Sequence, residues 1–327
     1  MKDNALDVSA GAPPGGPPGN LLANPPRGTM EWRAVVRVLR SPARAASSVF
    51  DDLVMTFFPA DCRACGASLL HAEFSPQDIP ICDLCLSQLR PQSQTVASAL
   101  CRVCGEALGM ESDRFLGNSP TEGLLCSPCR FVPPSFERAV AYGVYKDELR
   151  EMLHLLKYDG VRSLARPLAA KLALAILMFE RAEGWTGRAS VISVPLFAGS
   201  HSQRGFNQAE ALADEAIVNL RKLRPGWNLK AKHGLLKRVK ATESQFNLSD
   251  KGRRRNLIGA FKVFDETNAL AGADVLLIDD IYTTGATSRA CSQALIKAGA
   301  RRVWVATLAR AQKEQVALWD SGARDFG

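Results

Sequence analysis

The stretch Val275–Thr287 combines two adjacent carboxylates with a run of hydroxyl and small side chains. Val275–Ile278 has the continuous aliphatic pattern of a buried parallel strand, and Asp279 and Asp280 follow it directly. The next residues open a segment of helical pattern: Thr283, Thr284, Gly285, Ala286 and Thr287. Free backbone N–H groups at a helix start suit a phosphate, and ligands of parallel sheets bind at the carboxyl ends of strands. Acids for sugar hydroxyls beside a phosphate loop predict a sugar-phosphate site.

The alternative interpretation of this stretch is a strand that ends in a solvated acid pair. Thr283 or Thr284 would then be an ordinary helix cap. We favour the binding site, because both the strand before the acids and a helix over 286–298 are recognisable in the pattern.

A second loop could supply donors for a pyrophosphate. A strand pattern over 189–194 ends at Pro195, and a helix pattern begins near residue 207. Arg204, Gly205, Asn207 and Gln208 lie where that loop meets the helix, so a guanidinium and backbone N–H groups converge there. Asn207 could equally be only the cap of the helix, and both interpretations can hold together.

The segment 237–256 carries seven basic and two acidic residues, a net charge of +5. It lies between two short strand patterns, over 235–239 and 260–263, so it could form a hood over an anionic ligand or bind a nucleic-acid backbone. A solvated charged loop is the alternative. Thr242, Gln245 and Asn256 add hydrogen-bonding capacity that a simple charge run lacks.

Eight of the nine cysteines form four C-x-x-C pairs: Cys62/Cys65, Cys82/Cys85, Cys101/Cys104 and Cys126/Cys129. Two such pairs supply the four thiolates that a structural zinc ion prefers, and Gly66 and Gly105 provide permissive turn backbone. Disulfides would need an oxidising compartment, and a redox C-x-x-C normally accompanies a βαβ pattern, which is missing here. We expect two structural zinc sites paired in sequence order, with interleaved pairing as the alternative. The ninth, Cys291, is expected to be a buried helix residue.

Composition narrows the classes of protein and of partner. The 327 residues carry a formal charge of +8, which favours acidic partners such as phosphates or nucleic acid. The sequence has no run of eighteen apolar residues, so we expect no membrane span, and the N-terminus lacks an apolar secretory core. The expected location is therefore the cytoplasm, where thiols stay reduced.

The patterns predict four segments. Residues 1–29 are rich in proline and glycine and are expected to be a disordered tail, and 30–58 form a helical lead-in. In the lead-in, Arg33, Arg37 and Arg40 share one stripe, which we interpret as a solvated face rather than a nucleic-acid or membrane contact. Residues 59–132 are a double zinc ribbon. Residues 136–315 alternate strands and helices, which predicts a parallel sheet covered on both faces.

The expected elements of that last segment follow from its periodicity. The strands are 139–145, 189–194, 235–239, 260–263, 275–280 and 303–308, and the helices are 146–157, 163–181, 207–220 and 286–298.

Taken together, the motifs resemble the ComF family, a double zinc ribbon followed by a type I phosphoribosyltransferase-like domain. The similarity runs from about Phe58 to Arg310 and includes FPADCRAC, CRVCG, HLLKYDG, SVPL, RGFNQAEALA, LLIDDIYTTGAT and TLAR. It also includes a spaced set of residues: Arg238, Thr242, Gln245, Leu248, Arg253, Asn256 and Phe261.

This resemblance implies an α/β fold, in which a type I phosphoribosyltransferase-like parallel sheet with flanking helices follows the ribbon. It implies binding of phosphoribosyl pyrophosphate (PRPP) with Mg²⁺, with Asp279 and Asp280 as catalytic residues that contact the ribose hydroxyls. The 5′-phosphate would bind Thr283–Thr287, and Arg204, Gly205 and Lys157 would complete the PRPP site. The hood would present Arg238, Thr242, Gln245, Arg253 and Asn256.

Two classes of function follow from the resemblance. The first is a phosphoribosyltransferase of unknown acceptor, associated with competence and DNA uptake. The second is a non-catalytic PRPP-sensing or nucleic-acid-binding accessory protein, whose partner would be single-stranded DNA or a DNA-uptake protein. Between Leu196 and Arg204 the family places several basic residues, whereas this chain has only His201. The resemblance therefore supports PRPP binding more strongly than catalytic transfer.

Overall fold

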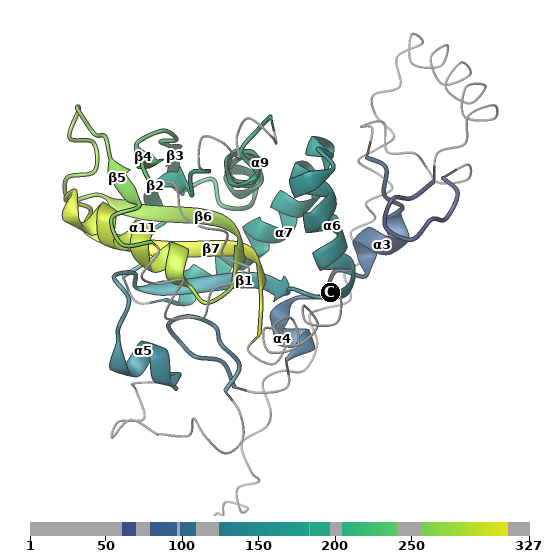
Figure 1. Cartoon of the computed structure of the whole chain (residues 1–327), viewed down its shortest axis with the longest axis horizontal. Helices are drawn as coiled ribbons and strands as arrows, with labels where there is room; N and C mark the ends of the chain where they lie inside the picture. Colours follow the sequence, from purple (N-terminus) through teal and green to yellow (C-terminus); the bar gives the residue numbers. More distant parts are fainter. Residues whose placement is uncertain are drawn as a thin grey trace, which may run out of the picture. The chain divides into compact units, whose positions relative to one another are not determined.

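A five-stranded parallel sheet is the framework of the protein (Figure 1). The structure is a computed structural model that describes residues 61–69, 79–96, 99–108, 124–182, 184–196, 205–240 and 257–312, all within one compact unit, Phe58–Gly327. The strand order is β1-β7-β6-β2-β3, and every neighbouring pair is parallel. The strands are β1 (Arg138–Val144), β2 (Arg188–Ser193), β3 (Asn228–Ala231), β6 (Asp274–Tyr282) and β7 (Arg302–Arg310).

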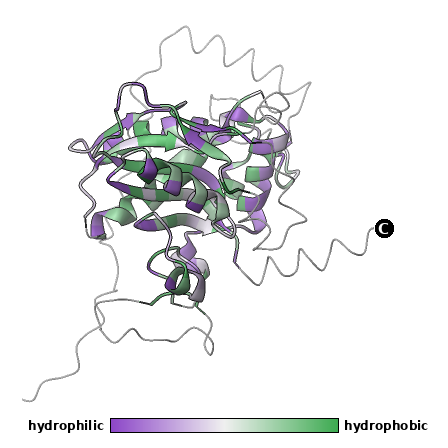
Figure 2. Cartoon of the chain, turned by 60° about the vertical axis from the view of Figure 1, so that its left-hand side comes forward, coloured by the Kyte–Doolittle hydropathy of each residue, from purple (hydrophilic) through white to green (hydrophobic). Residues whose placement is uncertain are grey.

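Helices cover both faces of this sheet. Strand β6 shows the division, because Leu276 and Ile278 join the apolar cluster that contains α7 and α9, whereas Val275 and Leu277 join the cluster that contains α11. Side chains alternate between the faces of a strand, so a strand buried on both sides needs a continuous aliphatic run. The helices are α6 (Asp147–Tyr158), α7 (Ala165–Leu177), α9 (Gln208–Leu223) and α11 (Ala286–Lys297). Figure 2 shows much of the hydrophobic colour in the strands.

A two-stranded antiparallel hairpin, β4 (Leu236–Arg238) and β5 (Phe261–Val263), packs beside α11. Its inner residues Leu236 and Phe261 belong to the same cluster as Val275 and Leu277 of β6. Residues 241–256 of the connection between the two strands, which include Thr242, Gln245, Arg253 and Asn256, lie outside the described residues. The hairpin is therefore the described base of the predicted hood.

Local sequence explains where the helices begin. Asn207 caps α9, and its side chain accepts a hydrogen bond of 3.0 Å from the N–H of Ala209. Helix α11 follows Gly285, which has a φ of 75°, a left-handed conformation that favours glycine. Helix α6 buries five apolar side chains, each contributing roughly 2 kcal/mol: Leu149, Met152, Leu153, Leu155 and Leu156.

The paired cysteines lie on short turns and short helices. In each set the first C-x-x-C pair is on a turn closed by a single bridge, Asp61↔Ser68 or Leu100↔Ala107, and Gly66 and Gly105 have positive φ there as expected. The second pair lies at a helix start, in α3 (Asp83–Ser87) or α5 (Ser127–Phe131). A third short helix, α4 (Gln92–Thr95), precedes the second turn.

In the segment 136–315, the expected elements match the structure closely, with one omission. The α/β fold class with a parallel sheet is confirmed, and each predicted strand and helix has a counterpart, although 163–181 is divided into η1 (Arg162–Leu164), α7 and η2 (Met178–Arg181). Strand β3 was not predicted, because Leu229 is the only buried residue of its four. Residues 1–58, with the expected tail, lead-in and arginine stripe, lie outside the described residues. Within the described part of the chain, no helix is long and apolar enough to cross a membrane.

Candidate functional site

Asp279 and Asp280 lie near the carboxyl end of β6 and face opposite sides of the sheet, because side chains alternate along a strand. Asp280 is buried, with 4% of its surface exposed, and Asp279 is partly buried. The Asp280 N–H donates a hydrogen bond of 2.9 Å to Oδ1 of Asp279. The two neighbouring acids therefore have different surroundings, which the sequence pattern did not reveal.

Asp280 is held by a lysine and an amide from two helices. Its Oδ2 lies 3.0 Å from Nζ of Lys157, at the end of α6, and accepts a hydrogen bond of 2.8 Å from Nε2 of Gln208, at the start of α9. Burial alone would lower the pKa of Lys157, but the charges of Asp280 and Asp279 more than offset this, so the pKa is raised. The structure thus brings Lys157 to the acids, and it adds Gln208 as a partner that sequence reasoning missed.

Asp279 has the more unusual electrostatics of the pair. Burial raises its pKa, the adjacent charge of Asp280 raises it further, and Lys157 and Arg238 oppose the shift, which leaves the pKa at about 8. Such a carboxyl can exchange a proton near neutral pH. Perturbed groups of this kind concentrate at functional sites.

The loop predicted to bind phosphate, Thr283–Thr287 (the phosphate loop), runs from the end of β6 into the first two residues of α11. Gly285 turns the chain into the helix, and Oγ1 of Thr284 lies 3.4 Å from the N–H of Ala286. The Tyr282 ring fills the space behind Gly285, where an added Cβ would lie 2.1 Å from the tyrosine oxygen. The loop is thus shaped by close packing, and it presents the amino end of a twelve-residue helix beside the acids.

The eight paired cysteines form two quartets in sequence order, Cys62/Cys65/Cys82/Cys85 and Cys101/Cys104/Cys126/Cys129. Sulfur–sulfur distances are 3.9 Å for Cys62–Cys85, 3.7 Å for Cys65–Cys82 and 3.6 Å for Cys104–Cys126. Four sulfurs placed tetrahedrally at zinc's usual bond length would be about 3.8 Å apart. Each quartet could therefore hold a metal ion, and the interleaved pairing is excluded.

Comparison with known proteins decides the family. The DNA utilization protein YhgH of Salmonella typhi is 31% identical over 256 residues, which are 78% of this chain and 99% of that relative. Competence protein F of Haemophilus influenzae is 29% identical over 258 residues, which are 79% of this chain and 100% of that relative. The chain belongs to the ComF family. No protein-family model matches the sequence.

Solved structures similar to this ComF-family chain include two phosphoribosyltransferases. The hypoxanthine-guanine phosphoribosyltransferase of Bacillus anthracis is 15% identical, with a TM-score of 0.29, over 46% of this chain and 73% of that chain. The enzyme of Schistosoma mansoni, in complex with IMP, is also 15% identical, with a TM-score of 0.26, over 46% of this chain and 57% of that chain.

The remaining predicted site residues of this ComF-family protein are only partly described. Gly205 has a φ of 71° and lies just before the cap of α9, whereas Arg204 and His201 are outside the described residues. Arg238, at the end of β4, is partly buried, and burial lowers its pKa against the attraction of Cys291 and Asp279. Arg238 is therefore the described hood residue that acts electrostatically on Asp279.

A serine, a histidine and an aspartate form a chain of contacts near the same edge of the sheet. Ser193 Oγ lies 3.1 Å from Nδ1 of His233, whose Nε2 lies 3.1 Å from Oδ1 of Asp214. Ser193 is the buried end of this chain, and the Asp214 side chain is 58% exposed. A nucleophile must reach its substrate, so this arrangement suits fixing the end of β2 rather than covalent catalysis.

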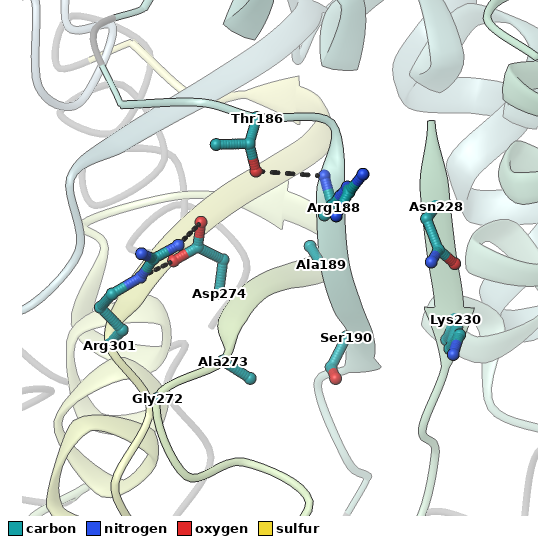
Figure 3. Close-up of a pocket in the computed structure, with 10 residues that line it drawn as sticks. All are labelled: Thr186, Arg188, Ala189, Ser190, Asn228, Lys230, Gly272, Ala273, Asp274 and Arg301. Atoms are coloured by element: carbon teal, nitrogen blue, oxygen red, sulfur yellow. Dashed lines mark hydrogen bonds and ion pairs between the residues drawn. The ribbon is translucent and has the colours of Figure 1, made fainter. Parts of the chain in front are cut away.

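A basic pocket lies at the opposite, amino-terminal edge of the sheet (Figure 3). It has a volume of about 530 Å³ and is lined by Arg188, Lys230 and Arg301, by the acid Asp274 and by smaller residues. Arg301 is already paired with Asp274, which it contacts through two hydrogen bonds of 2.9 Å. The pocket is remote along the strands from Asp279, so it is separate from the predicted sugar-phosphate site.

Proposed function

We propose that this ComF-family protein binds PRPP with Mg²⁺ at the carboxyl end of β6 and acts as a phosphoribosyltransferase. The observation that carries the proposal is the juxtaposition of the Asp279–Asp280 pair with the amino end of α11. The pair could hold the ribose hydroxyls, and the helix terminus could hold the 5′-phosphate of the same sugar. The names of the relatives refer to DNA utilization and competence, which suggests that the activity serves one of these processes.

In this proposal the 5′-phosphate binds the phosphate loop. The first N–H groups of α11 have no partners within the helix, and the helix dipole favours an anion there. Thr283, Thr284 and Thr287 are all partly exposed, so their hydroxyl groups can donate to phosphate oxygens. Gly285 permits the close approach of the backbone.

The two acids take different roles in the proposal. Asp280 is already engaged by Lys157 and Gln208, so it positions the lysine near the pyrophosphate. Within the described residues Asp279 forms no such ion pair, and it would contact the ribose directly. A developing positive charge on the sugar ring would stabilise the ionised form of Asp279, whose pKa of about 8 is otherwise high.

Mg²⁺ would neutralise part of the pyrophosphate charge and help it leave. Arg238, with Arg204 and the hood residues Thr242, Gln245, Arg253 and Asn256, would supply further donors to the anionic ligand. We further propose zinc in both cysteine quartets. With four thiolates a zinc ion has no open position, so its role is structural, and its thiolates need a reducing compartment such as the cytoplasm.

Calorimetry tests the binding site directly. PRPP with Mg²⁺ is titrated into the wild type, Asp279→Asn and Asp214→Asn, the last being the loss of one exposed carboxylate that is not among the predicted site residues. We expect Asp279→Asn to weaken binding about tenfold or more, because a hydrogen bond to a charged group contributes about 1.5–3 kcal/mol. The Asp214→Asn variant should bind as the wild type does. Equal affinities for all three proteins, or no binding by the wild type, would refute the proposal.

Pyrophosphate release, screened across nucleobases, tests the transfer step. Release that depends on one base, and that Asp279→Asn abolishes, would support the transferase. PRPP binding without release from any acceptor would favour the alternative, a PRPP-sensing accessory protein.

One observation favours nucleic-acid binding as a second candidate function. Lys237 and Lys262 are directly opposite each other in the β4–β5 hairpin, and both are exposed. Two like charges in this arrangement repel each other and destabilise the hairpin unless an anion lies between them. Lys237 Nζ also lies 4.9 Å from the centroid of the exposed Phe264 ring. A salt titration of single-stranded DNA binding, with Lys237→Gln/Lys262→Gln as the variant, tests this candidate. Binding that is insensitive to salt or to the double substitution would remove it.

A further inference from the structure

The two cysteine quartets have different surroundings. In the first, Cys65 is exposed and Cys82 is partly exposed, and an ion pair at the surface, Arg63–Asp159, 3.4 Å apart, joins this turn to the end of α6. In the second, all four cysteines are buried. They share one apolar cluster with Tyr282 and Ala286, the residues on either side of the phosphate loop's turn. The second quartet is thus part of the core beneath the candidate site.

Arg310 connects the second quartet to the strand that carries the acids. It is the last residue of β7, is 3% exposed, and is the register partner of Tyr282 in β6. Its guanidinium donates 2.5 Å to the carbonyl oxygen of Cys104 and 3.6 Å to Sγ of Cys104, and it pairs with the buried Glu106. The same guanidinium lies 4.3 Å from the centroid of the Tyr282 ring. That ring is the one packed behind Gly285.

Arg289 makes a second connection, from the other side of the phosphate loop. It lies in the first turn of α11, and its own N–H donates to the carbonyl oxygen of Gly285. Its guanidinium donates 2.5 Å to the carbonyl oxygen of Val132, and it also contacts the carbonyl oxygen of Pro128 (3.4 Å) and Sγ of Cys129 (3.7 Å). The loop therefore has an arginine-mediated contact with the quartet at each end.

Charge explains why these two arginines suit a metal-loaded quartet. Four thiolates around one Zn²⁺ carry a net charge of about two negative units, and two guanidinium groups offset it. Each arginine contacts one sulfur, and hydrogen bonds to metal ligands orient them and stabilise the site. Glu106 adds one further negative charge on the Arg310 side. In the first quartet, the described sulfurs accept hydrogen bonds from cysteines and from the backbone N–H groups of Ala64 and Ala67.

We infer that metal bound by the second quartet holds the phosphate loop in its binding conformation through Arg310 and Arg289, so that occupancy of this quartet regulates the sugar-phosphate site. Without the metal ion, nothing holds the four sulfurs together, and the acceptors for both guanidinium groups lose their fixed positions. Tyr282 and the first turn of α11 are then less constrained. The inference rests on the proposed function for its ligand, and it concerns Arg310 and Arg289 as positioning residues.

Hydrogen exchange, read by mass spectrometry, tests the coupling without any sugar-phosphate ligand. Exchange is compared in zinc-loaded and chelator-stripped protein carrying Cys65→Ser/Cys82→Ser, so that only the second quartet binds metal. We expect amides of 282–290 to exchange about tenfold faster after zinc is removed, while amides of β2, away from both arginines, change little. Unchanged exchange over 282–290, with zinc loss verified by a chromogenic chelator, would overturn the inference.

The reciprocal experiment uses PRPP with Mg²⁺ as the probe. Coupling of binding free energies is symmetric, so saturating PRPP should raise the zinc affinity of the second quartet, measured by competition with a chelator at equilibrium, by the same factor as zinc raises the affinity for PRPP, on the order of tenfold. An equal zinc affinity with and without PRPP would overturn the inference. If PRPP does not bind at all, the proposed function fails instead, and the exchange experiment alone decides the coupling.

Arg289→Gln separates positioning from simple folding. This side chain is partly exposed, so the variant should fold and keep its zinc. We expect its affinity for PRPP to fall about tenfold with an unchanged zinc content. Arg301→Gln, which removes an exposed arginine at the far edge of the sheet, is the control and should bind PRPP normally. Equal affinity of both variants and the wild type would contradict a role for Arg289.

Discussion

At the scale of single residues, Asp279 and Asp280 are neighbours with opposite electrostatic surroundings. Asp280 is neutralised by Lys157, whereas Asp279 is partly buried beside a negative charge. An acid of this kind suits a site in which the carboxyl ionises only when the ligand binds, because the bound ligand then stabilises the ionised form. In the ligand-free protein, ionised Asp279 lowers the stability of the fold, and this loss of stability can be measured.

Asp279→Asn should stabilise the protein, and more so at high pH. The pKa of Asp279 is near 4 in an unfolded chain and about 8 in the folded protein, so between these values the folded state holds a proton that the unfolded state has released. Wild-type stability therefore falls as the pH rises through this window, and asparagine, which cannot ionise, removes the loss. The melting temperature of Asp279→Asn relative to wild type should increase from pH 5 to pH 8.5.

Asp265→Asn is the control for this prediction and should show the opposite trend. Hydrogen bonds from the N–H groups of Ala269 and Leu270 lower the pKa of Asp265 against the effect of burial. Its charged form therefore stabilises the fold at neutral pH and loses that benefit in acid. The deficit of Asp265→Asn should shrink as the pH falls. Parallel pH profiles for both variants would contradict the assignment of Asp279.

Lys157→Met should destabilise the fold more than removal of both charges. The single substitution leaves Asp280 buried with only Gln208 as a partner, and breaking a buried ion pair in this way typically costs about 3–5 kcal/mol. Lys157→Met/Asp280→Asn removes the unpaired charge, so part of the loss should be recovered. Urea unfolding of the wild type, both single variants and the double variant measures the coupling. A double variant less stable than Lys157→Met would contradict it.

At the scale of elements, β6 and α11 were predictable because their signals are local. A continuous aliphatic run, two acids and a glycine before a helical period are all contained in 275–298. Strand β3 was not predictable, since one buried leucine in four residues carries no period and its identity depends on pairing with β2. The pattern predicted the two hairpin strands over residues 235–239 and 260–263, but it did not predict that these strands pack beside α11.

The site partners show the same limit. Lys157 was predicted as a site residue only from the resemblance to a family. Gln208 was predicted to lie where a loop meets a helix, but not to be a partner of Asp280, 72 residues away. Arg310 and Glu106 are 204 residues apart, and nothing local distinguishes them from surface charges. Spacing predicted both cysteine quartets, because tetrahedral ligation constrains sequence separation, but it did not distinguish their burial.

Gly285→Ala should distort the phosphate loop beyond the ordinary cost of a left-handed residue. A Cβ there would lie 2.1 Å from the oxygen of Tyr282, whereas Gly272, which also has positive φ, has no atom within 4 Å of an added Cβ. Gly272→Ala therefore measures the conformational cost alone, about 1 kcal/mol. Gly285→Ala should lose more stability in urea unfolding and should also weaken PRPP binding. Equal losses of stability from both substitutions would show that the Tyr282 ring moves away from the added Cβ with no loss of free energy.

At the scale of the whole molecule, the two cysteine quartets belong to different apolar clusters on opposite sides of the sheet. Cys62 and Cys85 join the cluster with α7 and α9, and the second quartet joins the cluster with α11 and the inner residues of the hairpin. Both quartets therefore join the ribbon to the sheet domain. The second is connected to strands β6 and β7 by Arg310, which contacts both Cys104 and the Tyr282 ring.

Loss of one ligand from each quartet should consequently have unequal effects on global stability. Cys65 is exposed, so Cys65→Ser should release one zinc ion and leave the main unfolding transition of the sheet nearly unchanged. Cys101 is 2% exposed and lies within the α11-side cluster, so Cys101→Ser should lower the melting temperature of that transition by several degrees. Calorimetry with elemental analysis should find about two zinc ions per wild-type chain and about one in each variant. Because the metal count then falls equally in both, a difference in melting temperature reports where the metal is coupled to the core. Identical melting temperatures would mean that the stability of the sheet does not depend on which quartet loses its metal. This result would contradict a stabilising role for the packing of Tyr282 and Arg310 against the second quartet.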